Sequence, residues 1–182
     1  MSRLAQVERL AMVIATILIL HGCATLRVNS YLERGADFGR YRSYAWAASD
    51  AFSTGDPRLD NNRFFSERVE SAVDRQLRGR GFEKTRADVA DLVIHIHARV
   101  DQRLDTNTID QEYSRCDVEE CRPMVYDAGT LLLDFIDTRR NTLAWRGWAE
   151  GSLDGVIDDQ QLMEETIDKA VESILERLPR PQ

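Results

Sequence analysis

An alternating pattern of apolar and polar side chains occupies residues 91–100, which read Asp91-Leu92-Val93-Ile94-His95-Ile96-His97-Ala98-Arg99-Val100. The even-numbered positions are all apolar, from Leu92 to Val100. Successive side chains of a β-strand point to opposite faces of its sheet, so these positions share one face and His95 and His97 lie on the other. The pattern therefore predicts a strand with one face on the hydrophobic core.

Other stretches of the chain also have strand character. Residues 26–32 alternate in the same way, and residues 38–46 end in the aromatic pair Tyr44 and Trp46, which suits a pleated, half-buried surface. Residues 130–137 and 143–150 are strand-like and are joined by Arg139-Arg140-Asn141, which predicts a hairpin.

Two segments repeat apolar residues at helical spacing. The first follows a loop at 53–57, would be capped by Asp60 or Asn61 and would stop at Gly79 or Gly81. Its charged side chains are expected to face solvent, and they are Glu67, Arg68, Glu70, Asp74, Arg75 and Arg78. The second ends at Pro179, and its apolar stripe consists of Met163, Ile167, Ala170, Val171, Ile174 and Leu178.

This order of elements predicts an α+β fold. Strand, strand, helix, three strands and a helix would form a mostly antiparallel sheet of about five strands, with both helices packed on one face. The other face would carry aromatic residues and the two histidines, which makes it a plausible binding surface. We assign Trp46, Trp145 and Trp148 to this surface, with core packing as the alternative interpretation of the aromatic residues.

The N-terminus has the features of an export signal. A short head with Arg3 and Arg9 precedes an apolar run of 11 residues, Leu10 to Leu20, which is too short to span a bilayer. Leu20-His21-Gly22-Cys23 resembles the lipobox of bacterial lipoproteins, although His21 departs from the usual pattern. The resemblance implies that residues 1–22 are a lipoprotein signal peptide and that 23–182 form a single periplasmic domain.

Cys23 would then carry a thioether-linked diacylglycerol and an acyl chain such as palmitate on its amine. Two or more chains anchor a protein stably to a membrane, whereas one does so only marginally. Ala24 stands where Asp would retain a Gram-negative lipoprotein in the inner membrane, so we expect the outer membrane, facing the periplasm. The alternative is an ordinary signal peptide that is cut nearby and leaves Cys23 as a plain thiol.

The charge balance excludes one class of partner. Residues 1–22 carry two basic residues and one acidic residue, so the remaining 160 carry 22 basic and 30 acidic side chains, a net charge of −8. Nucleic-acid binding needs a basic face, so no nucleic-acid partner is expected. The membrane would be reached through the lipid rather than through basic residues.

The other two cysteines are Cys116 and Cys121. In an oxidising periplasm they would close a small disulfide loop, and free thiols or a metal site are the alternatives. Residues 101–127, which include both, are polar and too long for a tight turn. We expect this segment to contact an envelope protein partner.

Catalytic motifs are absent from the sequence. It has no Gly-x-Ser-x-Gly elbow and no His-Glu-x-x-His helix. Asp134, Asp137 and Glu150 are the nearest approach to a pair of catalytic carboxylates, and Asp134 and Asp137 would point to opposite faces of a strand. His95 and His97 are weak metal candidates because a third ligand is not evident. We therefore expect neither an enzyme nor a cofactor, and a binder of a small ligand, lipid or metal is the alternative.

Several short motifs together resemble the uncharacterised Gram-negative lipoproteins of the domain of unknown function 4136 family. The resemblance covers nearly all of residues 23–182 and implies no established activity, so no catalytic residue can be carried over. The motifs are the lipobox at Cys23, Tyr41-Arg42-Ser43-Tyr44-Ala45-Trp46, Asp56-Pro57-Arg58-Leu59, Asp91-Leu92-Val93-Ile94, Gly129-Thr130-Leu131-Leu132-Leu133-Asp134 and Leu143-Ala144-Trp145-Arg146-Gly147-Trp148-Ala149-Glu150-Gly151.

Overall fold

The computed structural model describes residues 26–48, 53–60, 62–104 and 125–180. Six strands form one sheet in the order β1-β6-β5-β4-β2-β3. The elements are β1 (Arg27–Leu32), β2 (Ser43–Trp46), α2 (Arg63–Gly79), β3 (Glu83–Lys84), β4 (Leu92–Leu104), β5 (Val125–Asp137), β6 (Thr142–Ser152) and α4 (Gln160–Leu175).

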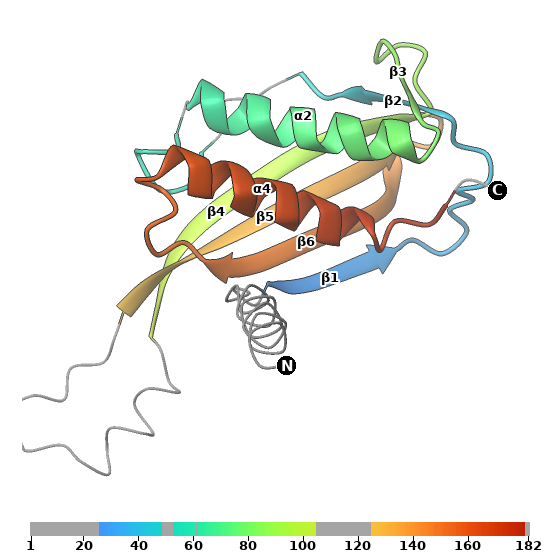
Figure 1. Ribbon diagram of the computed structural model, residues 1–182. Coiled ribbons are helices and arrows are strands. Elements are labelled where there is room, and N and C mark those ends of the chain that lie inside the picture. Colours follow the sequence, from blue (N-terminus) through green and yellow to red (C-terminus); the bar gives the residue numbers. More distant parts are fainter. Residues whose placement is uncertain (1–25, 49–52, 61, 105–124, 181–182) are drawn as a thin grey trace, which may run out of the picture.

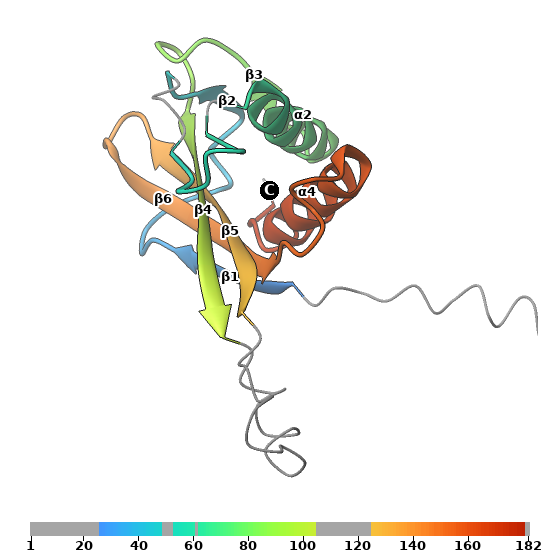
Figure 2. The same ribbon diagram turned by 90° about the vertical axis from the view of Figure 1, so that its left-hand side faces the viewer.

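Both helices pack side by side on one face of the sheet (Figure 1). The view turned by 90° shows two layers, with the helices on one side of the strands and no described element on the other (Figure 2). The prediction of an α+β fold with two helices is confirmed. Neither of the two described helices is long and apolar enough to cross a lipid bilayer.

The sheet itself differs from the prediction of about five mostly antiparallel strands. It has six strands and is mixed, because β2 runs parallel to both β4 and β3. The parallel pairing follows from the connection, since α2 carries the chain from β2 back to the start of β4. Strand β3 has only two residues and follows Gly81, whose φ of 86° makes the turn. A strand of two residues is too short to be predicted from an alternating pattern of side chains.

Each helix begins at a side chain that caps its first turn. Asn62 accepts a hydrogen bond from the Phe65 backbone N–H and starts α2, so the predicted caps, Asp60 or Asn61, are one or two residues early. Asp159 accepts from the Leu162 N–H and starts α4. These carboxylate and amide oxygens satisfy donors that have no partner inside the helix.

A single hydrophobic core lies between the helices and the sheet. Its side chains come from both helices, from alternate positions of β4 and β5, and from β6, where the adjacent residues Ala144 and Trp145 are both buried at a register shift. Burying each large apolar side chain contributes about 1.5–3 kcal/mol. The largest fully buried side chains are Trp145, Tyr44, Phe135, Leu77, Leu92 and Ile94.

Gly147 allows the indole of Trp145 to lie flat in this core. A Cβ atom at position 147 would be 2.1 Å from Cη2 of Trp145 and 2.7 Å from Cγ2 of Ile174 on α4. Phe135 meets the indole edge-on, with ring centroids 5.1 Å apart. Because Gly147 has no side chain, the indole and α4 can pack directly against its backbone.

Two buried or half-buried carboxylates fix the ends of central strands. Asp91, just before β4, accepts hydrogen bonds from the backbone N–H groups of Arg42 and Ser43 and from the Ser43 hydroxyl. Asp137, at the end of β5, accepts from the Tyr41 hydroxyl at 2.7 Å. Burial alone would raise the pKa of Asp137, but the hydrogen bonds outweigh it and the pKa is lowered.

A methyl group at Gly147 should disrupt the core. We expect Gly147→Ala to lower the free energy of unfolding by at least about 2 kcal/mol, because Trp145 or α4 must shift to accept the Cβ. The measurement is urea unfolding followed by tryptophan fluorescence. Gly79→Ala is the matched control, since nothing lies within 4 Å of its added Cβ and alanine favours the helix. Equal unfolding midpoints for the two variants would contradict this packing.

Asp137 should make stability depend on pH in the acidic range. Its lowered pKa means that the stabilisation is complete above the unfolded-state value of about 4 and is lost as the pH falls through the folded-state value. We expect Asp137→Asn to cost about 1–2 kcal/mol at pH 7, and this cost to shrink below pH ~4. Urea unfolding from pH 7 to pH 3 measures it, with exposed Asp88→Asn as control. A cost that does not change with pH would refute the assignment.

Candidate functional site

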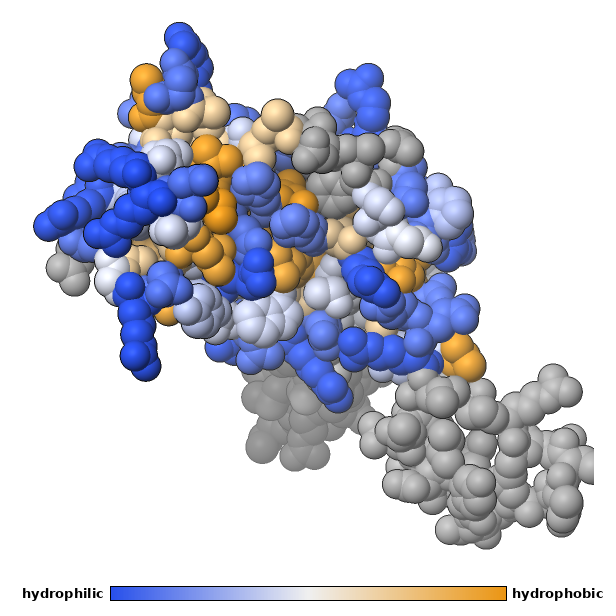
Figure 3. All heavy atoms as spheres, turned by 180° about the vertical axis from the view of Figure 1, so that it is seen from behind, coloured by the Kyte–Doolittle hydropathy of each residue, from blue (hydrophilic) through white to orange (hydrophobic). Residues whose placement is uncertain are grey.

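The face of the sheet opposite the helices presents rows of side chains that run across four strands. Figure 3 views the molecule from this side and shows polar and apolar side chains intermixed. Neighbours in a row are cross-strand partners in the sheet, so their side chains lie next to one another. One row is His95, Asp134, Arg146 and Tyr31, and the next is His97, Leu132, Trp148 and Asn29. We call this surface the uncovered face.

An ion pair lies at the centre of the uncovered face. Arg146 donates from Nε to Oδ1 of Asp134 and from Nη2 to Oδ2, both at 2.6 Å. Asp134 is only 6% exposed, and its hydrogen bond raises the pKa of the Arg146 guanidinium. Nε2 of His97 is 3.7 Å from Oδ2 of Asp134. Each oxygen of the carboxylate thus accepts a hydrogen bond from the Arg146 guanidinium.

The two histidines lie on the uncovered face, as the alternation predicts, and both are exposed. Their rings are parallel to within 6°, with centroids 6.4 Å apart. Within the described residues, no three His, Cys, Asp or Glu side chains are placed to hold a metal ion together. Two imidazoles alone leave a metal site incomplete.

The three tryptophans do not form one surface. Trp148 is half-buried on the uncovered face, but Trp145 is 1% exposed and points into the core. Trp46 lies on the helix side, where its Nε1 donates to Asp74 of α2 at 3.0 Å. The prediction is therefore wrong for Trp46 and Trp145. Positions 145 and 148 differ by an odd number, so a strand must turn their side chains to opposite faces.

The remaining acidic candidates are each held by a different partner. Asp137 accepts from Tyr41, and Glu150 pairs with Arg103, whose Nη1 is 3.2 Å from its Oε2. Asp74, expected to face solvent, instead accepts from the Tyr44 hydroxyl at 2.8 Å. Burial and this bond raise the pKa of Tyr44. A helical pattern alone could not show that a charged position faces the end of β2.

A hollow of about 550 Å³ borders the part of β4 that lies beyond the end of β2. The residues that line it include Trp46, His95, His97 and Glu70 of α2. The pKa of Glu70 is raised, chiefly by burial. Sequence reasoning placed Glu70 on a solvated helix face and so missed it. The hollow combines an aromatic ring with groups that can gain or lose a proton, which suits a small polar ligand.

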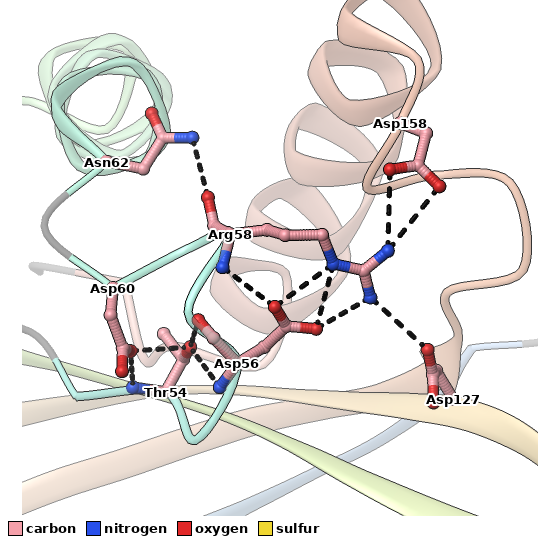
Figure 4. Close-up of polar contacts among 7 residues, drawn as sticks. All are labelled: Thr54, Asp56, Arg58, Asp60, Asn62, Asp127 and Asp158. Carbon is pink, nitrogen blue, oxygen red and sulfur yellow. Dashed lines mark hydrogen bonds and ion pairs between the residues drawn. The ribbon is translucent and has the colours of Figure 1, made fainter.

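Arg58 is the centre of a second polar cluster, formed by residues that are far apart in the chain (Figure 4). Its Nη2 lies 2.7 Å from Oδ2 of Asp56 and 3.5 Å from Oδ2 of Asp127, and its Nη1 lies 3.4 Å from Asp158. The hydrogen bond from Arg58 lowers the pKa of Asp56. The cluster ties the loop before α2 to the start of β5 and to the residue two positions before α4.

The loop that contains Arg58 is also joined to the sheet. The Thr54 carbonyl accepts from the Val100 N–H at 2.8 Å, and the Thr54 hydroxyl donates to Asp60 at 2.9 Å. Asp60 thus orders this loop instead of capping α2. The motif Asp56-Pro57-Arg58-Leu59, which resembles the family pattern, therefore has a structural explanation in the Arg58 cluster.

Some predicted features lie outside the described residues. These are Cys23 with the signal segment, and Cys116 and Cys121. The polar segment predicted at 101–127 contains strand residues at both of its ends, because β4 and β5 are paired as far as Leu104 and Val125. Alternation continues through polar residues there, so composition alone did not reveal the strands.

Loss of the Arg58 guanidinium should weaken the fold. We expect Arg58→Met to lower the free energy of unfolding more than the control variant does, because Asp56, only 9% exposed, loses its charged partner. Arg63→Met is the control, since the Arg63–Glu67 pair is solvent-exposed and should contribute less than about 0.5 kcal/mol. Urea unfolding compares the two. If Arg58→Met lowers the free energy of unfolding no more than Arg63→Met does, the Arg58 cluster does not stabilise the fold.

Solved structures with a similar fold share little sequence with this chain. A PDZ domain protein from Parabacteroides distasonis is 14% identical with a TM-score of 0.54, and the match covers 87% of this chain but only 37% of that one. A PelC dodecamer from Paraburkholderia phytofirmans is 14% identical with a TM-score of 0.48, over 87% and 100% of the two chains. The similarity to the PDZ domain protein indicates the fold alone.

A DUF4136 family protein from Bacteroides thetaiotaomicron is 11% identical with a TM-score of 0.49, and the match covers 79% of this chain and 92% of that one. No curated protein matches the chain. The model of the family described as "Domain of unknown function (DUF4136)" matches residues 28–180, which is every strand and helix of the fold except the first residue of β1. The chain belongs to the DUF4136 family.

Proposed function

We propose that this protein is a lipid-anchored, non-enzymatic interaction module at the periplasmic face of the outer membrane. The observation that carries the proposal is the uncovered face, a sheet surface on which half-buried Trp148 and Leu132 lie among polar side chains. Tryptophan beside paired charges is typical of residues that contribute strongly to protein interfaces. The partner would be an envelope protein.

The membrane location is supported by the N-terminal sequence. The apolar run before Cys23 is too short to span a bilayer, and the lipobox-like residues around it suit cleavage and lipidation. Only three residues, 24–26, separate Cys23 from β1. A tether of this length would hold the domain close to the membrane surface.

The chemistry of the uncovered face supports binding better than catalysis. Asp134 forms an ion pair with Arg146, and Glu150 forms one with Arg103. A general acid or base needs a proton position that a substrate can reach, whereas these carboxylates already accept hydrogen bonds from guanidinium groups. Paired charges on a sheet surface can still set the orientation of a partner.

Photocrosslinking in cells tests this proposal. A photoreactive amino acid at His97 should give one dominant adduct with an envelope protein, and Trp148→Ala should reduce its yield about tenfold or more, because a central tryptophan often contributes over 2 kcal/mol to binding. The control position is Glu172, exposed on α4 and therefore on the opposite side of the molecule. The same adducts from His97 and Glu172 would contradict the proposal.

The same experiment tests the anchor. In a Cys23→Ser variant the protein should leave the membrane fraction and the His97 adduct should fall, because the lipid no longer holds the domain beside its partner. Retention of the variant in the membrane fraction would show that Cys23 is not the anchor.

The hollow beside β4 favours a second candidate function, the binding of a small ligand. The residues around the hollow include aromatic Trp46, Glu70, whose pKa is raised chiefly by burial, and His95. A chain that is anchored and well expressed but gives no specific protein adduct from His97 would favour this function over an interaction module.

A further inference from the structure

Strand β1 forms a free edge of the sheet. The strand order ends at β1 on one side and at β3 on the other. Strand β3 is a two-residue edge with the charged pair Glu83 and Lys84, whereas β1 has six residues. A long edge strand presents unpaired N–H and C=O groups to any other strand. Figure 1 shows β1 at the outer margin, with no described strand beyond it.

β1 has few of the features that protect an exposed edge. It contains no proline, no lysine and no register shift against β6, and its one charged residue, Arg27, stands at its first position. Tyr31 and Leu32 are 47% and 49% exposed, on opposite faces of the strand. The edge is therefore open to pairing with another strand.

The backbone geometry shows which residues present free hydrogen-bonding groups. The Glu33 N–H donates to the Ala144 carbonyl at 3.1 Å, so position 33 faces β6. In an antiparallel strand, alternate residues bond to opposite neighbours. Val28, Ser30 and Leu32 therefore direct their N–H and C=O groups away from β6.

We infer that a second copy of this chain pairs with the β1 edge in an antiparallel arrangement centred on Ser30. In this register Ser30 lies opposite the partner's Ser30, and Val28 lies opposite the partner's Leu32. All three outward-facing residues are then paired on both chains, which a shift of two positions in either direction would not allow. The two sheets become one continuous sheet across the interface.

The side chains complement one another in this register. Arg27 lies opposite the partner's Glu33, so two pairs of opposite charge form by symmetry. Arg27 lies opposite Glu150 of β6, whose carboxylate pairs with Arg103, and forms no ion pair of its own with a described residue. Glu33 is held in place by the Tyr31 hydroxyl, 2.6 Å from its Oε2. The contact is isologous and closes as a dimer, which leaves β1 with no free edge.

Disulfide crosslinking tests the register. The full chain, with Cys116 and Cys121 changed to serine, is purified in a mild detergent as Ser30→Cys or as Asn29→Cys and oxidised with copper phenanthroline. Paired residues at position 30 would have Cα atoms about 5.5 Å apart, within the span of a disulfide. Position 29 would lie diagonally across from position 29 of the second copy. The two Cα atoms would be about 7–8 Å apart, which is too far for a disulfide.

We expect Ser30→Cys to form dimers at least about ten times faster than Asn29→Cys. Both sites are exposed and both variants retain Cys23, so reactions of Cys23 contribute equally to the two rates. Equal rates would overturn the register.

Charge reversal tests the dimer itself. Sedimentation equilibrium of the full chain should show a monomer–dimer equilibrium, and Arg27→Glu or Glu33→Arg should each weaken it about tenfold, because two attractive pairs become repulsive. The double variant restores opposite charges across the interface and should recover most of the affinity. A wild-type chain that stays monomeric at about 100 µM, or a double variant that is no better than the single ones, would overturn the inference.

Discussion

The indole of Trp145 lies between the bare backbone of Gly147 and the side chain of Ile174, and this contact sets how closely α4 approaches the sheet. Phe135 completes it from the neighbouring strand. The position of α2 also depends on this contact, because α2 packs against α4 as well as against the sheet. With the apolar side chains of both helices committed to one face, the opposite face is left to water or to a partner.

Acidic side chains hold much of the remaining structure together. Asp91 and Asp137 fix the ends of central strands, Asp74 joins α2 to β2, and Asp56 holds Arg58. Each of these carboxylates accepts at least two hydrogen bonds, and those of Asp56 all come from Arg58 in the same loop. A chain with an excess of acid thus uses several of its acids as structural acceptors, which is why acidic composition alone points to no catalytic site.

Alternation predicted the strand at residues 91–100, because one buried face imposes a period of two on it. Helical spacing predicted both helices for the same reason. The parallel position of β2 depends on how the chain returns over α2, which side-chain patterns do not record. The Arg58 cluster unites residues about 70 and 100 positions apart, and only the folded chain reveals it. The assignment of the tryptophans failed where the rule of alternation was not applied from Trp145 to Trp148.

The pairing of β4 with β5 continues beyond the end of β6. Strand β6 supports β5 as far as the pair Ala128 and Ser152, and beyond it β4 and β5 form a ribbon of two strands that ends at Leu104 and Val125 (Figure 2). Ribbons of two strands twist more and are marginally stable alone. Local opening at this end therefore need not reach the core. The end of the ribbon can therefore open without a change in the pairing of β5 with β6.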